Sequence, residues 1–325
     1  MKKYLITGFS GFVSRHFLEY LEINQIRASI KGLDINNPEF NSESFKFIKY
    51  DFEKVDLLDI DSVENIIFEF QPDYVLHLAS FSSVAFSWKE PILSFKNNTN
   101  IYLNLLEAVR KLNLPTRILS VGSSEEYGDV KETDLPLTED HPLKPVSPYA
   151  VARVSQELLS QIYVKGYNLD IVMTRSFNHI GPFQKDIFVV SSFVKQLLEI
   201  INKAEKKDTL ITGDINIVRD FTDVRDVVSA YYLLLNRGEK GEIYNVCSGV
   251  GISLENIIKI VIKYLDIEVI IKVDPERIRP SDNKAIVGSN SKIKGLGWDQ
   301  KYLLEDTLKD LIDYWKIKTF PIVKS

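Results

Sequence analysis

Residues 4–14 read YLITGFSGFVS, an apolar run that ends in two glycines and leads into the amphipathic stretch VSRHFLEYLEI at 13–23. This order predicts a strand, a tight turn and a helix. Gly8 and Gly11 let the backbone turn sharply and approach a phosphate at the helix N-terminus, and Ser14 stands where a third glycine is usual. The stretch therefore predicts the first unit of a dinucleotide-binding α/β fold.

Asp34 ends the next expected strand, ASIKGLD at 28–34, 20 residues after Ser14. An acidic residue at this place accepts hydrogen bonds from a ribose 2′-hydroxyl and repels a 2′-phosphate, so we expect NAD rather than NADP. An aspartate at a strand end also caps turns, and this second role stays open. Asp51, after the run FKFIKY at 45–50, is a weaker candidate for contacting the adenine amino group.

The first half of the chain alternates strand-like runs with amphipathic stretches, which predicts βαβ units and a parallel sheet. Expected strands lie at 4–8, 28–34, 45–50, 73–79, 117–124, 170–176 and 242–248. Expected helices lie at 13–23, 61–70, 92–112, 147–164, 223–237, 188–203, 252–265 and 302–316. We expect a doubly wound parallel Rossmann sheet at 1–177 with returning segments 217–248, and a smaller C-terminal α+β substrate-binding lobe at 178–216 and 249–325.

Composition narrows the class of protein. A chain of 325 residues with a net charge of -5 can bury a large core but has no basic surplus for nucleic acid. Cys247 is the single cysteine, so an intrachain disulfide is excluded and a reducing cytoplasm fits best. The apolar stretch 257–273 is interrupted by charged residues, among them Lys259, Lys263, Asp266 and Glu268, so no membrane span is expected. The four histidines are scattered, and no metal site is expected.

Eight motifs follow one another in an order that resembles the extended short-chain dehydrogenase/reductases. They are TGFSGF (7–12), HLAS (77–80), SVGSSEEYG (120–128), SPYAVAR (147–153), RSFNHIGP (175–182), GDINIVRDFTDVRD (213–226), YNVCSG (244–249) and RPSD (279–282). Within that family the chain resembles the GDP-sugar branch, namely GDP-4-keto-6-deoxymannose reductases and GDP-mannose 4,6-dehydratases. The resemblance covers nearly the whole chain.

The resemblance implies a catalytic tyrosine, Tyr149, that exchanges a proton with the sugar 4-hydroxyl while hydride moves between C4 and the nicotinamide. Ser123 or Ser124 would hydrogen-bond the same oxygen. Family members carry lysine four residues after the tyrosine, where this chain has Arg153. Arginine keeps the positive charge that stabilises a phenolate but does not exchange protons, so we expect an active site that works at a reduced rate. A surface arginine on an inactive helix is the alternative.

Glu125 matches the glutamate that moves the C5 proton in the dehydratases, and a carboxylate capping the turn before Tyr127 is the alternative role. For the substrate, the resemblance implies contacts from Ser82, Asn178, Arg219 and Arg279, the two arginines holding a diphosphate. Paired guanidinium groups suit that ligand. For the coenzyme, it implies contacts from Gly8, Ser10, Gly11, Phe12, Val13, Asp34, Asp51, Phe52, Leu78, Ala79, Ser80, Asn98, Tyr149 and Arg153.

The leading hypothesis is an NAD-dependent oxidoreductase acting at C4 of a GDP-mannose-type hexose or heptose, for surface glycans. A GDP-mannose 4,6-dehydratase is the first alternative, and an inactive scaffold that binds NAD and a nucleotide sugar is the second. The helices at 92–112 and 148–166 carry apolar faces that the family uses for a four-helix dimer contact. We therefore expect a homodimer or homotetramer.

Overall fold

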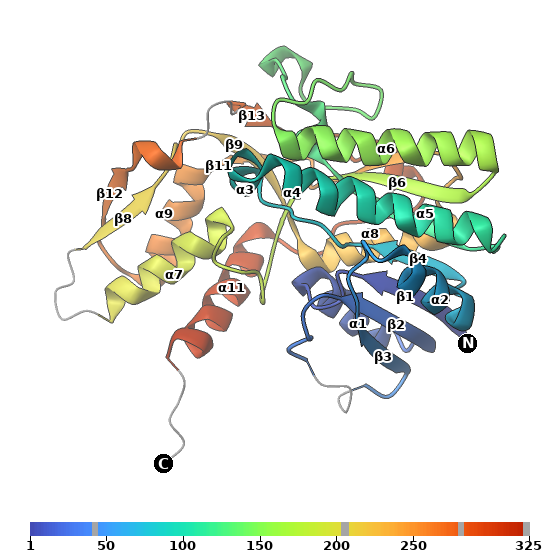
Figure 1. Ribbon diagram of the computed structural model, residues 1–325. Coiled ribbons are helices and arrows are strands. Elements are labelled where there is room, and N and C mark those ends of the chain that lie inside the picture. Colours follow the sequence, from blue (N-terminus) through green and yellow to red (C-terminus); the bar gives the residue numbers. More distant parts are fainter. Residues whose placement is uncertain (41–44, 203–207, 279–282, 321–325) are drawn as a thin grey trace.

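The computed structural model describes residues 1–40, 45–202, 208–278 and 283–320 (Figure 1). Within these ranges, seven parallel strands form one sheet that is covered by helices on both faces. In spatial order the strands are β10 (Ile243–Val246), β6 (Asp170–Ser176), β5 (Arg117–Ser123), β4 (Tyr74–His77), β1 (Lys2–Thr7), β2 (Ala28–Asp34) and β3 (Ile48–Lys54). The arrangement confirms the expected doubly wound parallel Rossmann sheet.

Two apolar cores lie on the two faces of this sheet. One face is covered by α1 (Phe12–Ile23) and α8 (Val224–Arg237), and the other by α2 (Ile60–Phe70), α5 (Ile101–Lys111) and α6 (Pro148–Tyr167). Tyr4 and Ile6 of β1 belong to the first core, and Leu5 between them belongs to the second. Because successive side chains of a strand point to opposite faces, a strand between two helical layers must be apolar throughout, as YLI is.

The pairing register brings several strand ends to the same edge of the sheet. Thr7 at the end of β1 pairs with Leu33 of β2 and with His77 of β4, and Ser123 at the end of β5 pairs with Ser176 of β6. In open α/β sheets, ligands bind at the edge formed by the carboxyl ends of the strands. The loops that carry most of the predicted motifs therefore start from this edge.

A smaller lobe lies beside the sheet (Figure 1). In the described residues its strands are β7 (Asn178–Ile180), β9 (Val218–Asp223), β11 (Gly251–Ser253) and β13 (Ala285–Ile286) in one sheet, and β8 (Thr209–Thr212) with β12 (Ile270–Val273) in another. Its main helices are α7 (Val189–Ile201), α9 (Leu254–Leu265) and α11 (Leu304–Thr319). These helices bury a core of their own, which includes Leu197, Ile257 and Leu311.

Shorter elements complete the described chain. They are α3 (Val84–Lys89), α4 (Pro91–Phe95), a π-helical turn (Lys96–Asn100), three 3₁₀ turns (Ser124–Tyr127, Glu132–Asp134 and Pro275–Arg277) and α10 (Ser291–Gly295). The π-helical turn interrupts the helix expected at 92–112. Such turns are frequent at functional sites.

The third strand departs from its expected position. It runs from Ile48 to Lys54, whereas FKFIKY had predicted 45–50. The backbone N–H groups of Lys46 and Phe47 donate to the carboxylate of Glu22 at 2.7 and 2.9 Å, so these two residues are held against α1 before the strand begins. The shift changes which acidic residue follows β3.

The chain returns from the lobe to the large sheet after β9. Residues 218–223 pair within the lobe, and the return consists of α8 and β10. We propose a domain boundary after β6, with α8 and β10 belonging to the dinucleotide-binding domain. No helix in the described part of the chain combines the length and apolar character needed to cross a bilayer.

Candidate active site

The turn after β1 is shaped for close approach of two backbones. Gly8 has φ of +69°, and a Cβ added to it would lie 2.8 Å from the backbone N of Ala79 and 2.8 Å from the carbonyl carbon of Leu78. Both the left-handed conformation and the lack of space require glycine. The predicted residues Gly8, Leu78 and Ala79 therefore lie together where β1 and β4 end.

The N-terminus of α1 is suited to an anion. Its N-cap is Gly11, which offers no side chain to the first N–H groups, and its first turn holds no acidic residue. Backbone N–H groups and the helix dipole there favour a phosphate group. Phe12 begins the helix, and its ring stacks on His179 of the lobe at a centroid distance of 5.6 Å. The turn and helix thus fit a pyrophosphate, with Phe12 and Val13 in the first turn.

Asp34 is held over the glycine turn by two backbone donors. Its Oδ2 accepts a hydrogen bond from the N–H of Ser10 at 3.0 Å, and its Oδ1 accepts from the N–H of Asn36 at 2.9 Å. The second bond is the turn-capping role that the sequence left open, and the first ties the carboxylate to the glycine turn. A single carboxylate therefore does both, at the carboxyl end of β2 beside the glycine turn.

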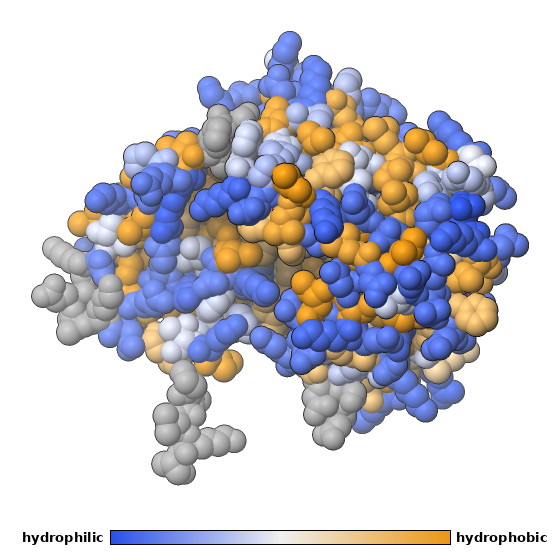
Figure 2. Space-filling view, viewed as in Figure 1, coloured by the Kyte–Doolittle hydropathy of each residue, from blue (hydrophilic) through white to orange (hydrophobic). Residues whose placement is uncertain are grey.

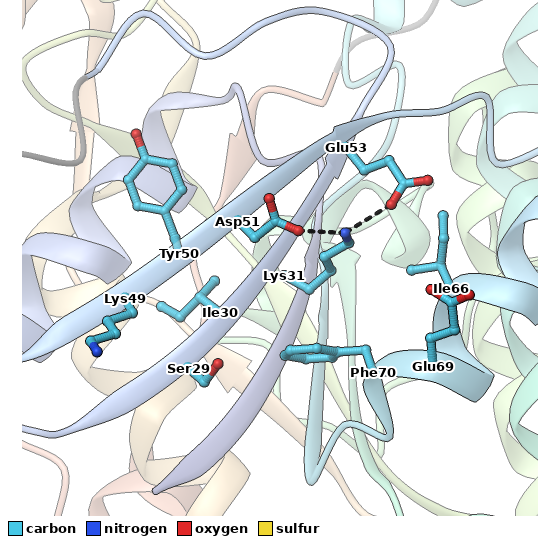
Figure 3. Close-up of a pocket in the computed structure, with 10 residues that line it drawn as sticks. All are labelled: Ser29, Ile30, Lys31, Lys49, Tyr50, Asp51, Glu53, Ile66, Glu69 and Phe70. Carbon is cyan, nitrogen blue, oxygen red and sulfur yellow. Dashed lines mark hydrogen bonds and ion pairs between the residues drawn. The ribbon is translucent and has the colours of Figure 1, made fainter.

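Asp51 does not lie at this edge. Because β3 starts later than expected, Asp51 falls inside the strand, 75% of its side chain is exposed, and it pairs with Lys31 at 2.6 Å. Lys31 also pairs with Glu53, and these side chains border a hollow of about 300 Å³ between β2, β3 and α2 (Figure 3). The expectation that Asp51 follows the third strand was wrong.

Phe52 and Asp56 lie closer to the predicted coenzyme site. The ring of Phe52 packs against Phe9 of the glycine turn at 6.0 Å. Asp56 follows the end of β3, accepts from the N–H of Leu58 at 2.9 Å, and is preceded by Val55, whose N–H bonds to the Asp34 carbonyl at 2.9 Å. Asp56 therefore takes the place that sequence reasoning had given to Asp51. Locating β3 three residues later would have identified it.

The loop after β4 is supported from the π-helical turn. Asn98 is fully buried, and its Nδ2 donates to the carbonyls of Ser94 at 2.7 Å and Phe81 at 3.4 Å. Ser80 and Ser82 flank Phe81 in this loop. The side-chain amide of Asn98 thus positions the loop that carries Ser80 and Ser82, and its predicted contact with the coenzyme stays a prediction.

Tyr149 and Arg153 form a buried pair on α6. Ser147 caps the helix by accepting from the N–H of Ala150 at 3.1 Å, which places Tyr149 in the first turn and Arg153 one turn later. The Nε of Arg153 donates to the Tyr149 hydroxyl at 3.1 Å, and each of the two residues is 5% exposed. The alternative of a surface arginine is therefore wrong.

The surroundings leave the positive charge of Arg153 without a negative partner. No carboxylate in the described ranges lies at ion-pair distance, and the guanidinium donates instead to Tyr149, to the Val121 carbonyl at 3.0 Å and to Gln156 Oε1 at 2.7 Å. Burial, together with this guanidinium, lowers the pKa of His77 to about 3, so His77 is neutral. A buried cation without a carboxylate favours a negatively charged or strongly polar group nearby, and the Tyr149 hydroxyl is the side-chain group that Nε of Arg153 faces.

β5, which ends at Ser123, and the 3₁₀ turn after it, which carries Ser124 and Glu125, both pack against α6. Ser123 caps this 3₁₀ turn, and its Oγ accepts from the N–H of Glu125 at 3.2 Å. The carboxylate that completes the capping box belongs to Glu126, which accepts from the Ser123 N–H at 2.6 Å. The structure therefore gives the capping role to Glu126 rather than to Glu125.

The predicted substrate residues lie in and beside the lobe. Asn178 is exposed on β7. Arg219 on β9 is buried, and its Nη1 donates to the carbonyls of Val218 and Asn283, each at 2.9 Å. Arg279 lies outside the described residues, but Asn283 directly follows its RPSD motif. Arg219 is thereby tied to the end of that motif.

Comparisons with known proteins match this architecture along nearly the full length. The model of the family described as GDP-mannose 4,6 dehydratase matches residues 5–311. GDP-6-deoxy-D-mannose reductase of Pseudomonas aeruginosa is 31% identical over 316 residues, which cover 97% of each chain.

Solved structures agree in fold. RMD from Pseudomonas aeruginosa, complexed with NADPH, matches with a TM-score of 0.83 at 29% identity and covers 98% of this chain and 100% of that chain. UDP-glucose 4-epimerase of Thermus thermophilus, in complex with NAD, matches with a TM-score of 0.84 at 29% identity and covers 97% of this chain and 99% of that chain.

Proposed function

The chain belongs to the GDP-mannose 4,6 dehydratase family of extended short-chain dehydrogenase/reductases, and we propose that it is an NAD-dependent oxidoreductase acting at C4 of a GDP-mannose-type sugar. The substrate is GDP-mannose, GDP-manno-heptose or a 4-keto derivative, and the product serves the synthesis of surface glycans. The similarity to GDP-6-deoxy-D-mannose reductase supports redox chemistry at C4 without elimination of water.

The observation that carries this proposal is the buried pair of Tyr149 and Arg153. The guanidinium lies 3.1 Å from the tyrosine hydroxyl, has no carboxylate partner among the described residues, and is surrounded by neutral groups. Such a cation stabilises a phenolate strongly because little water screens it. Tyr149 is therefore equipped to act as a general base.

In the proposed reaction, Tyr149 accepts the proton of the sugar 4-hydroxyl during oxidation and returns it when a 4-keto sugar is reduced. Ser123 or Ser124 donates a hydrogen bond to the same oxygen and orients it. NAD supplies the hydride acceptor, and NADH the donor. Arg153 holds the charge on Tyr149 but does not itself exchange a proton, because guanidinium does not deprotonate in proteins.

NAD is proposed over NADP because of Asp34. Its carboxylate is held by Ser10 and Asn36 at the end of β2, where it accepts from a ribose 2′-hydroxyl and repels a 2′-phosphate. The similar RMD structure contains NADPH, as expected for a biosynthetic reductase. An acidic residue at this place instead suits an enzyme that oxidises the 4-hydroxyl or keeps NAD(H) bound and recycles it.

The nucleotide sugar would bind between the sheet edge and the lobe. We propose that Asn178 faces the sugar nucleotide, that Ser82 contacts the sugar, and that Arg219 and Arg279 hold the diphosphate. Two guanidinium groups form paired, charge-assisted hydrogen bonds with phosphate oxygens. The bond from Arg219 to the carbonyl of Asn283, the residue that follows the RPSD motif in the sequence, is consistent with this pairing.

A GDP-mannose 4,6-dehydratase is the second candidate. It is favoured by the family description and by Glu125, which the turn after β5 places against α6 while Glu126 performs the capping. This enzyme would also oxidise C4, but Glu125 would then move the C5 proton while water leaves between C5 and C6.

Product masses distinguish these candidates. The purified protein is incubated with GDP-mannose or GDP-manno-heptose and NAD, and with a 4-keto-6-deoxy derivative and NADH. Loss of two hydrogens indicates a dehydrogenase, gain of two a reductase, and loss of water a dehydratase. If neither the native protein nor an Arg153→Lys variant converts any of these compounds while both bind them, the chain is a binding scaffold. The Tyr149→Phe variant serves as the inactive control.

We also propose a homodimer formed through α4, α5 and α6. Exposed apolar side chains gather on two of these helices, α4 and α6, and include Ile92, Phe95, Val151, Leu158 and Ile162. Figure 2 shows the hydrophobic surface over this part of the molecule. The spacing of Val151, Leu158 and Ile162 places them on one stripe of α6, which suits packing against a second copy.

A further inference from the structure

We propose that Gln156 is a positioning residue that sets the orientation of the Arg153 guanidinium toward Tyr149. The inference rests on the proposed function, because it concerns how the base of that reaction is tuned. Gln156 lies on α6 one turn after Arg153 and is 1% exposed. It therefore acts inside the protein, out of contact with solvent.

The amide of Gln156 connects the arginine to β5. Its Oε1 accepts from Nη1 of Arg153 at 2.7 Å, while its Nε2 donates to Ser120 Oγ at 2.9 Å and to the Val121 carbonyl at 3.1 Å. The amide orientation follows from chemistry, since guanidinium offers only donors and a carbonyl only accepts. If the amide were reversed, its NH₂ group would face the donor Nη1 of Arg153 and its oxygen would face the acceptor carbonyl of Val121. The bridge therefore has one stable arrangement.

The bridge decides which edge of the guanidinium meets the phenol. With Nη1 held between Gln156 and the Val121 carbonyl, the planar group presents Nε to the Tyr149 hydroxyl. Nη2 makes no hydrogen bond to the residues that the structure describes. A lysine ammonium would need no such support, because it is a compact charge without a preferred plane. Gln156 is thus matched to arginine at position 153.

The other titratable groups near the guanidinium do not supply a second charge beside Tyr149. They include His77 on β4, whose pKa burial lowers to about 3, and Tyr231 on α8, whose pKa burial raises above its usual range. Both side chains are therefore uncharged near neutral pH. The position of the Arg153 charge controls how readily Tyr149 acts as a base.

The test compares Gln156→Leu in two backgrounds, the native chain and Arg153→Lys. Leucine has similar bulk but no polar atom, and Gln161→Leu on the same helix is the control. In the native background we expect kcat/KM to fall about tenfold and the acid limb of the pH profile to move up by about one unit, with little change in KM. In the Arg153→Lys background the loss should be less than about twofold, because lysine does not depend on the bridge. Equal losses in both backgrounds, or a loss without a pH shift, would overturn the proposal.

A second readout needs no substrate. The appearance of phenolate absorbance with rising pH is compared between each protein and its Tyr149→Phe partner. Gln156→Leu should delay the Tyr149 signal by about one pH unit, and Gln161→Leu should leave it in place. If the native protein converts no GDP-sugar, the proposed function fails, but this titration still decides the role of Gln156. An unchanged titration in folded Gln156→Leu protein would refute it.

Discussion

Replacing Asp34 by asparagine should weaken the preference for NAD. In the structure, the half-buried carboxylate is fixed by the N–H groups of Ser10 and Asn36. At about 4 Å, a unit charge pair is worth about 4 kcal/mol near a protein surface and about 1 kcal/mol in water. For a partly exposed carboxylate facing a 2′-phosphate with nearly two charges, the repulsion is about 2–4 kcal/mol. The native protein should therefore bind NADH roughly thirtyfold to several hundredfold more tightly than NADPH.

In Asp34→Asn this charge term disappears, so the ratio of the NADPH and NADH dissociation constants should fall by at least about tenfold. The affinity for NADH should also fall about tenfold, because one oxygen that accepts from Ser10 or Asn36 becomes a donor. Titration calorimetry on coenzyme-free protein measures both constants. Asp73→Asn is the matched control, since Asp73 accepts from the backbone N–H of Lys3 at 2.8 Å at the start of β1, far from the glycine turn.

Two results would refute the reasoning. One is a native protein that binds NADPH as tightly as NADH, or that releases NADP(H) when denatured. The other is an Asp34→Asn variant with an unchanged ratio of the two constants. Either would mean that the carboxylate serves only as the turn cap for Asn36.

Arg153→Lys should raise the turnover rate, because an ammonium group exchanges protons. It should also lower the free energy of unfolding by about 1–3 kcal/mol, because Gln156 Oε1 loses its donor. Steady-state rates and urea unfolding measure the two effects, and an inactive variant with native stability would contradict both expectations. Ile162→Glu should convert a dimer to a monomer in light scattering, since Ile162 is 59% exposed on the apolar stripe of α6, whereas Lys165→Glu should not. Because the pKa of His77 is lowered to about 3 by burial, the unfolded chain binds the extra proton between about pH 3 and about 6.5, and stability falls as the pH drops through that window. Between about pH 7 and about pH 5, the native protein should lose about 2 kcal/mol of its free energy of unfolding, measured by urea unfolding, and the His77→Gln variant should not show this loss. An equal loss in both proteins would exclude His77 as its source.

Most of the fold could be predicted from the sequence because its signals are local. Runs such as YLI at 4–6 are apolar on both faces, and the glycines of the first turn carry their own stereochemistry. The third strand was misplaced because FKF at 45–47 has strand character but lies before the paired strand, which takes up only IKY at 48–50. Glu22, from a helix 24 residues earlier, holds Lys46 outside the strand.

For the candidate site, the sequence alone determined the glycine turn and Asp34, and it aligned Tyr149 with Arg153 one helical turn apart. Their spacing along one strand–turn–helix unit or one helix is enough to bring such residues together. Only the tertiary structure decided that Arg153 is buried beside Tyr149, that Gln156 of α6 connects it to β5 by hydrogen bonds, and that Glu126 rather than Glu125 caps the turn after β5. Burial and hydrogen-bond partners depend on which segments meet in space, and strands β4, β5 and β6 meet here from distant parts of the chain.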